Sequence, residues 1–271
     1  MNKNRTYSYT HGHHDSVVSV HATRRASEAA AFLLPHIEPG MRLLDFGCGP
    51  GTISIDLAAA VYPGGSVVGI DLSDSVIEQA ATRAREIGAT NITFEVNSVF
   101  DTGYESESFD VAYAHQVLQH VDSPVRALVE IKRLLKPGGL VAVREVDWGT
   151  MAVWPGDTRI EEFRRLYAEV AAHNGGEPNA GRCVKSWLGE AGFSQVTLSA
   201  SIWVHADPES CRWWGEQWAE RVRQSNIAET ALQNGIADEA ELVSIGNGWL
   251  DWMEKPDAFL MLAHVEGLGR K

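Results

Sequence analysis

The sequence has few cysteines and no long apolar run. Its only cysteines, Cys48, Cys183 and Cys211, are odd in number, far apart and outside any C-x-x-C pattern. This spacing argues against a disulfide framework or a zinc site, and it predicts reduced thiols in a cytoplasmic protein. No segment approaches the roughly 18 apolar residues of a membrane-spanning helix, and residues 1–15 lack the apolar stretch of a secretory signal. We therefore expect no membrane partner.

Positive charge is also sparse. The 271 residues include 23 Lys and Arg against 36 Asp and Glu, a formal net charge of −13, and the basic residues cluster only in pairs such as Arg24-Arg25. A surface that follows nucleic-acid phosphates needs the opposite sign, so we expect no nucleic-acid partner. The length suffices for one large α/β domain with an elaboration, or for two small domains.

The sequence does contain an unusual glycine turn. An apolar run carrying Asp45 ends in Gly47, Gly49 and Gly51, and the amphipathic segment 52–62 follows. This order predicts a buried strand, a tight turn and a helix. Glycine tolerates positive φ and lets a ligand approach the bare backbone, and free N–H groups at a helix start attract anionic groups. We expect a small, partly anionic ligand at this turn.

A second acidic residue specifies the ligand further. The predicted strand 66–70 ends in Asp71, 20 residues after Gly51, where a carboxylate can accept hydrogen bonds from both hydroxyls of a ribose. The glycine spacing G-x-G-x-G is one residue tighter than the dinucleotide fingerprint G-x-G-x-x-G. The pattern D-x-G-x-G-x-G with this second acid resembles motifs I and II of the class I S-adenosylmethionine-dependent methyltransferases more than it resembles NAD enzymes.

The resemblance implies an α/β fold with a doubly wound, mostly parallel, seven-stranded Rossmann-like sheet, its last strand antiparallel, and helical cap insertions. Alternating strands and helices up to residue 147 also predict a parallel sheet with the ligand at its carboxyl edge. The resemblance places cofactor contacts at these strand exits: Asp45, Gly47, Cys48, Gly49, Gly51, Thr52, Asp71, Leu72, Asn97, Ser98, Val99, Ala114, His115 and Gln116. Asn97 or Ser98 is expected to bond the adenine amine, and Val99 to pack on the ring.

We expect one integrated domain. Residues 1–40 form an arm and a helix, beginning at Asp15 or Ser16 and reaching about Leu34, that cover the cofactor. Residues 41–147 form the cofactor-binding core, and residues 148–271 complete the sheet, with insertions at 148–178 and 206–256 as a substrate cap. The histidines of the arm lack the paired spacing of a metal site, so no metal is expected. The oligomeric state is left open as monomer or homodimer.

All nine tryptophans lie from Trp148 onward. Either they line an apolar or aromatic acceptor pocket, or they are ordinary core or dimer contacts. The first reading predicts an enzyme of EC 2.1.1.- that methylates a small apolar or aromatic molecule. The alternative is a protein that binds the cofactor without transferring methyl, such as a cyclase or a regulator.

Methyl transfer from a sulfonium requires a base only if the acceptor must lose a proton. His115 is our first candidate, because a neutral imidazole suits pH 7, and Glu145 and Asp147 are further candidates. Arg144 could pair with an acceptor carboxylate or form an outward salt bridge.

Overall fold

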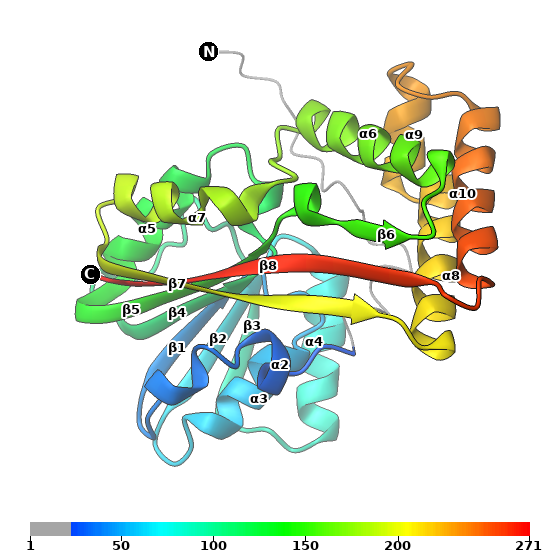
Figure 1. The fold of residues 1–271 in the computed structure, drawn as a ribbon. Coiled ribbons are helices and arrows are strands. Elements are labelled where there is room, and N and C mark those ends of the chain that lie inside the picture. The colour runs from blue at the N-terminus through cyan, green and yellow to red at the C-terminus, as the bar shows by residue number, and fades with distance from the viewer. Residues whose placement is uncertain (1–22) are drawn as a thin grey trace.

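The computed structural model describes residues 23–271 as one mixed sheet with helices on both faces (Figure 1). The N-terminal arm and the start of the helix expected at Asp15 or Ser16 lie outside the described residues. The elements of the cofactor half are α2 (Ala26–Ala29), η1 (Leu34–His36), β1 (Arg42–Phe46), α3 (Thr52–Ala60), β2 (Ser66–Asp71), α4 (Asp74–Glu86), β3 (Ile92–Val96), β4 (Phe109–His115), η2 (Leu118–His120), α5 (Pro124–Leu134) and β5 (Leu135–Val146).

The remaining elements complete the sheet and build a helical cap. They are η3 (Trp148–Thr150), β6 (Ala152–Trp154), α6 (Thr158–His173), α7 (Ala180–Glu190), β7 (Ser194–His205), α8 (Pro208–Gln224), α9 (Asn226–Gln233), α10 (Glu239–Met253) and β8 (Phe259–Arg270). Local sequence sets several of these boundaries. Asp207 caps α8 through the N–H groups of Glu209 and Ser210, and a capping box of Asp238 and Glu241 opens α10.

The strand order is β3-β2-β1-β4-β5-β8-β6, with β7 paired to the other side of β8. Strands β1 to β5 run parallel, and β8 runs antiparallel to β5, β6 and β7. The doubly wound sheet with an antiparallel last strand is therefore confirmed.

The sheet has eight strands among the described residues, not the expected seven. The additional strand β6 comes from a segment predicted as cap. Strand β8 pairs with β5 only from His264 onward. Its first residues, Phe259–Met261, are therefore not paired with β5, and β6 pairs with them instead.

The helix before the glycine turn also ends earlier in the sequence than the expected Leu34. Helix α2 stops at Ala29, and a turn then leads to η1, in which Pro35 occupies an early position. Ala30 leaves the helical conformation, with φ −123°, so the α-helix ends there, five residues before Pro35.

Within the part of the chain that the structure describes, three hydrophobic cores hold the layers together. One lies between the sheet and α2 and α3, a second lies between the sheet and α5 and α7, and a third joins β8 to α6, α8, α9 and α10. Figure 1 shows these last four helices gathered at one end of the sheet. Among residues 23–271, no helix combines the length and the apolar character needed to cross a bilayer.

Candidate active site

The glycine turn has the predicted backbone. Gly47, Gly49 and Gly51 all have positive φ, between 53° and 76°. A β-carbon added at Gly51 would lie 2.6 Å from the ring of Phe94, whereas one added at Gly49 would meet nothing within 4 Å. The turn therefore packs tightly on its inner side and presents open backbone at Gly49, where a ligand can approach.

Asp71 joins the two predicted motifs. One carboxylate oxygen accepts the N–H of Gly49 at 3.1 Å, and the other accepts the N–H of Ser73 at 3.1 Å. A carboxylate has about four acceptor positions, so two remain for a ligand with paired hydroxyls. Leu72, the next residue, has 51% of its surface exposed.

Asp45 lies behind the turn. Its carboxyl is buried and accepts the hydroxyl of Ser54 at 2.5 Å, which ties β1 to the first turn of α3. Burial raises the pKa of Asp45 to about 7. The hydrogen bond from Ser54 lowers this pKa, and repulsion from Asp71 raises it further. Burial also raises the pKa of the Cys48 thiol. These two side chains shape the turn, and Thr52 begins α3 beside them.

The exit of β3 forms a tight loop. The oxygen of the Asn97 amide accepts the N–H of Ser98 at 2.8 Å, and its nitrogen donates to the carbonyl of Thr102 at 2.8 Å. Val99 is half-buried against the core under α5. The Ser98 hydroxyl accepts the N–H of Phe100 at 3.3 Å, so each of the two residues expected near adenine already accepts one hydrogen bond within the loop.

The exit of β4 joins distant parts of the chain. Ala114 and His115 end the strand, and Gln116 follows with a positive φ of 56°, which is rare outside glycine. Arg24 donates to the side-chain oxygen of Gln116 at 2.7 Å, and the amide nitrogen lies 2.7 Å from Nε2 of His264. Such strained residues often occupy functional sites.

His264 on β8 was not among the predicted site residues. It is fully buried, and its ring stacks on His115 with centroids 6.4 Å apart. Because Arg24 fixes the oxygen of Gln116, the amide nitrogen donates and Nε2 of His264 accepts, which places the histidine proton on Nδ1. Burial, with repulsion from Arg144 and Arg24, lowers the pKa of His264 to about 2. A histidine within an apolar strand was the only sequence signal.

The two carboxylates considered as bases are engaged in structural hydrogen bonds. Buried Glu145 accepts the backbone N–H groups of residues 117, 118 and 119 at 2.8–3.3 Å, and burial raises its pKa to about 7. Asp147 receives two hydrogen bonds from the Arg182 guanidinium, at 2.6 and 2.7 Å. Glu145 fixes the loop after β4, and Asp147 fixes α7.

The expectation that Arg144 forms an outward salt bridge is wrong in its direction. Arg144 is buried, bonds to Ser201 and lies 3.5 Å from Glu266. Strand β8 lies beside β5 with Glu266 opposite Arg144, and β7, which carries Ser201, lies beside β8. The ion pair therefore forms across neighbouring strands, and burial lowers the pKa of Arg144.

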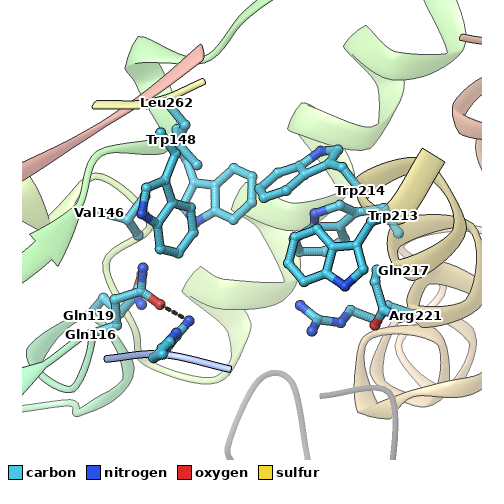
Figure 2. A pocket seen from close by; sticks show the side chains of 12 residues that line it. Gln116, Gln119, Val146, Trp148, Trp213, Trp214, Gln217, Arg221 and Leu262 are labelled. Atoms are coloured by element: carbon cyan, nitrogen blue, oxygen red, sulfur yellow. Dashed lines mark hydrogen bonds between the residues drawn. The ribbon is translucent and has the colours of Figure 1, made fainter. Parts of the chain in front are cut away.

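An aromatic cavity adjoins Gln116, and we call it the tryptophan pocket. Its free space is about 480 Å³, part of which opens to solvent. Its lining is Arg24, Gln116, Gln119, Val146, Trp148, Trp203, Trp213, Trp214, Gln217, Trp218, Arg221 and Leu262. Figure 2 shows Val146, Trp148 and Leu262 on one side and Trp213, Trp214, Gln217 and Arg221 on the other. The cap and the sheet therefore enclose it together.

The tryptophans differ in their surroundings. Five line the pocket. Trp249 and Trp252 are fully buried in the core of the cap, Trp187 packs against the core under α7, and Trp154 is 61% exposed. Among residues 23–271, no group of His, Cys, Asp and Glu has the arrangement of a metal site.

Comparison with known proteins identifies the family. A model described as a methyltransferase domain matches residues 37–216. An uncharacterised methyltransferase of Schizosaccharomyces pombe is 30% identical over 254 residues, which cover 91% of this chain and 90% of that protein. A protein of Aspergillus luteorubrus, named a probable methyltransferase, is 36% identical over 292 aligned positions that cover 98% of both chains.

Among solved structures, the cyclase SpnF is similar in fold, with a TM-score of 0.52 and 23% identity over 95% of this chain and 80% of that chain. This likeness shows the fold alone. The family model and the relatives that span nearly the whole chain are methyltransferases, and the cofactor of the family is S-adenosylmethionine. The chain belongs to the class I S-adenosylmethionine-dependent methyltransferases.

Proposed function

We propose that this methyltransferase acts on a small molecule bound in the tryptophan pocket. The observation that carries the proposal is the position of Gln116. This residue directly follows the carboxyl end of β4, on the cofactor edge of the sheet, and it also lines the pocket. A methyl donor at the strand exits and an acceptor between the tryptophans would thus meet at one residue.

The residues at the strand exits fit the cofactor. Open backbone at Gly49 and the free acceptor positions of Asp71 suit its amino-acid head and its ribose. We assign the remaining contacts as the motifs predict, to Gly47, Cys48, Gly51, Thr52, Leu72, Asn97, Ser98, Val99, Ala114, His115 and Gln116, with Asp45 shaping the turn. The bound cofactor supplies a methyl group already activated by the sulfonium charge.

The protein's own contribution is orientation and exclusion of water. If the acceptor loses a proton, we assign its acceptance to His115, which is buried at the end of β4 beside Gln116. His264 supports this position through its stacked ring. Both rings lie near the carboxyl end of β5, where His115 pairs with Arg144 and His264 with Val146. Side chains alternate between the faces of a sheet, so Glu145 and Asp147 point to the opposite face.

Composition supports a small-molecule acceptor in the cytoplasm. The net charge of −13 disfavours nucleic acid, and the three cysteines are all unpaired thiols, as in a reducing compartment.

Calorimetric titration with S-adenosylmethionine, S-adenosylhomocysteine and NAD tests the cofactor assignment. We expect tight binding of the first two alone. Release of S-adenosylhomocysteine on addition of candidate acceptors then tests transfer. Cofactor binding without release across a broad acceptor set would favour a protein that binds S-adenosylmethionine without transferring methyl.

A further inference from the structure

Strand β8 has one buried face and one partly exposed face. On the first, Leu260, Leu262 and His264 are fully buried, and the two leucines pack in the core of the cap. Side chains alternate along a strand, so the residues between and beside these three point to the opposite face. All of them are partly exposed, namely Phe259, Met261, Ala263 and Val265.

The neighbouring strands continue this exposed face. The register places Ala152 and Val204 beside Met261, and it places Ile202 beside Ala263. Figure 1 shows β6, β8 and β7 side by side here, with no helix drawn in front of them. We call the surface the outer sheet face, and its side chains are those of Ala152, Trp154, Leu198, Ala200, Ile202, Val204, Phe259, Met261, Ala263 and Val265.

All ten side chains of the outer sheet face are apolar. The largest exposed fractions are 61% for Trp154, 54% for Ile202, 53% for Val204 and 45% for Leu198. The indole N–H of Trp154 donates to Asp257 at 3.0 Å, so its hydrogen-bonding capacity is already used. A contiguous apolar patch of more than a few hundred Å² usually marks an interaction site.

Strand β7 also lacks the usual protection of an edge strand. Among the strands that the structure describes, it pairs only with β8. Residues 194–204 include no charged residue and no proline, although natural edge strands commonly carry such residues to keep a second sheet away. Their absence indicates that a partner covers this part of the sheet.

A second copy of the chain fits the outer sheet face. Each copy has a formal net charge of −13, so two copies repel each other where their charged surfaces meet. An uncharged face avoids this repulsion. Two apolar sheet faces pack with interdigitated side chains, as in a β-sandwich, and one patch can pair with its own copy across a two-fold axis.

The area of the outer sheet face also suits a dimer. If a fully exposed residue presents about 100–250 Å², the exposed fractions give about 600 Å² per copy. Two copies would then bury about 1,200 Å², which is the lower end of the range for stable protein interfaces.

We infer that the outer sheet face is the interface of a homodimer in which β6, β7 and β8 of two copies pack face to face. Strand β8 would then lie between the partner copy and the tryptophan pocket, because Leu262, on its opposite face, lines that pocket.

Sedimentation equilibrium of the full chain at about 1–100 µM tests the inference. We expect a mass of twice 29.7 kDa. Ile202→Glu and Val204→Glu each place a carboxylate inside the interface on both copies, so each should raise the dimer dissociation constant at least about 100-fold. Thermal unfolding of dilute samples shows whether the variants are folded.

Val129→Glu is the matched control. Val129 is 51% exposed on α5, outside the outer sheet face, so it receives the same substitution at nearly the same exposure as Val204. This variant should dimerise like the wild type. A loss of dimer as large as that of Val204→Glu would overturn the inference, because the effect would not depend on the outer sheet face.

Two further outcomes would also overturn the inference. One is a dimer that neither Ile202→Glu nor Val204→Glu weakens, since the interface would then lie elsewhere. The other is a wild type that stays monomeric at every concentration. If Val204→Glu also lowered the unfolding temperature of that monomer by about 5 °C or more, another segment of the same chain, within residues 1–22, would be the occupant of the face.

Discussion

The side-chain nitrogen of Gln116 donates to Nε2 of His264 across 2.7 Å, with Arg24 holding the oxygen of the same amide. This arrangement requires a neutral His264, and burial lowers its pKa to about 2, below the ordinary 6.5. Between these values the unfolded chain binds a proton that the folded chain does not. The contribution to stability is therefore complete above pH 6.5 and falls as the pH decreases toward 2.

His264→Asn should remove this dependence while keeping an oxygen that accepts from Gln116. As the pH falls below 6.5, the free energy of unfolding of the wild type should decrease relative to that of the variant. The decrease should be up to about 1.4 kcal/mol per pH unit. Urea titrations of both proteins at pH 7, 6 and 5 measure the difference. Other buried groups titrate in both proteins, so their effects cancel in the difference. If the free energies of unfolding of the two proteins changed in parallel with pH, a neutral His264 would be contradicted.

Asp71→Ala should weaken binding of S-adenosylhomocysteine by about 100-fold or more. Two hydrogen bonds to a charged group contribute about 1.5–3 kcal/mol each, and the substitution also frees the N–H of Gly49, which Asp71 accepts. Calorimetry measures the loss. Asp74→Ala, three residues away on the exposed start of α4, should bind normally; a similar loss there, or none at Asp71, would show that the ribose site is elsewhere.

Gly49→Ala and Gly51→Ala should separate binding from stability. Both place a side chain at positive φ, which destabilises by roughly 1–2 kcal/mol. At Gly51 the new methyl group also meets Phe94 and Ala80, so the total loss should reach about 3–5 kcal/mol.

At Gly49 the methyl group points into open space, so the variant should fold and lose at least 10-fold in affinity for S-adenosylhomocysteine. Thermal unfolding and calorimetry distinguish the two effects. Normal cofactor binding by Gly49→Ala would mean that the ligand does not approach this backbone.

Glu145→Ala should destabilise the protein by about 3–5 kcal/mol, because three buried N–H groups of the loop after β4 lose their acceptor. Urea unfolding measures the loss, with Glu190→Ala at the exposed end of α7 as the matched control. If Glu145→Ala abolished turnover with unchanged stability, a direct role in the reaction would replace the structural one.

Short-range spacing predicted the arrangement of the strand ends well. The distance in sequence from Gly51 to Asp71 implied two adjacent parallel strands, and the structure brings Asp71 to Gly49. Such spacing works because parallel strands exit at one edge whatever side chains follow. The alternation of strands and helices predicted the sheet for the same reason.

The pairing of distant segments was not predictable in this way. His264 and Gln116 are 148 residues apart, and Arg24 reaches Gln116 across 92. No local pattern encodes such contacts. Arg144 was expected to face solvent because a charged residue in a strand usually does, but the register with β8 places Glu266 opposite it. The roles of Glu145 and β6 likewise depend on partners far along the chain.

Strand β8 follows every other strand in the sequence but lies inside the sheet, between β5 and β7. A chain emerging from the ribosome can pair β1 to β5 early, but it cannot form either the His264 contact or the Leu262 wall of the pocket until residues 259–270 have appeared. Closing such long loops slows folding. Incomplete chains would therefore expose the interior edge of β5, and they are the species that chaperones and proteases would encounter during synthesis.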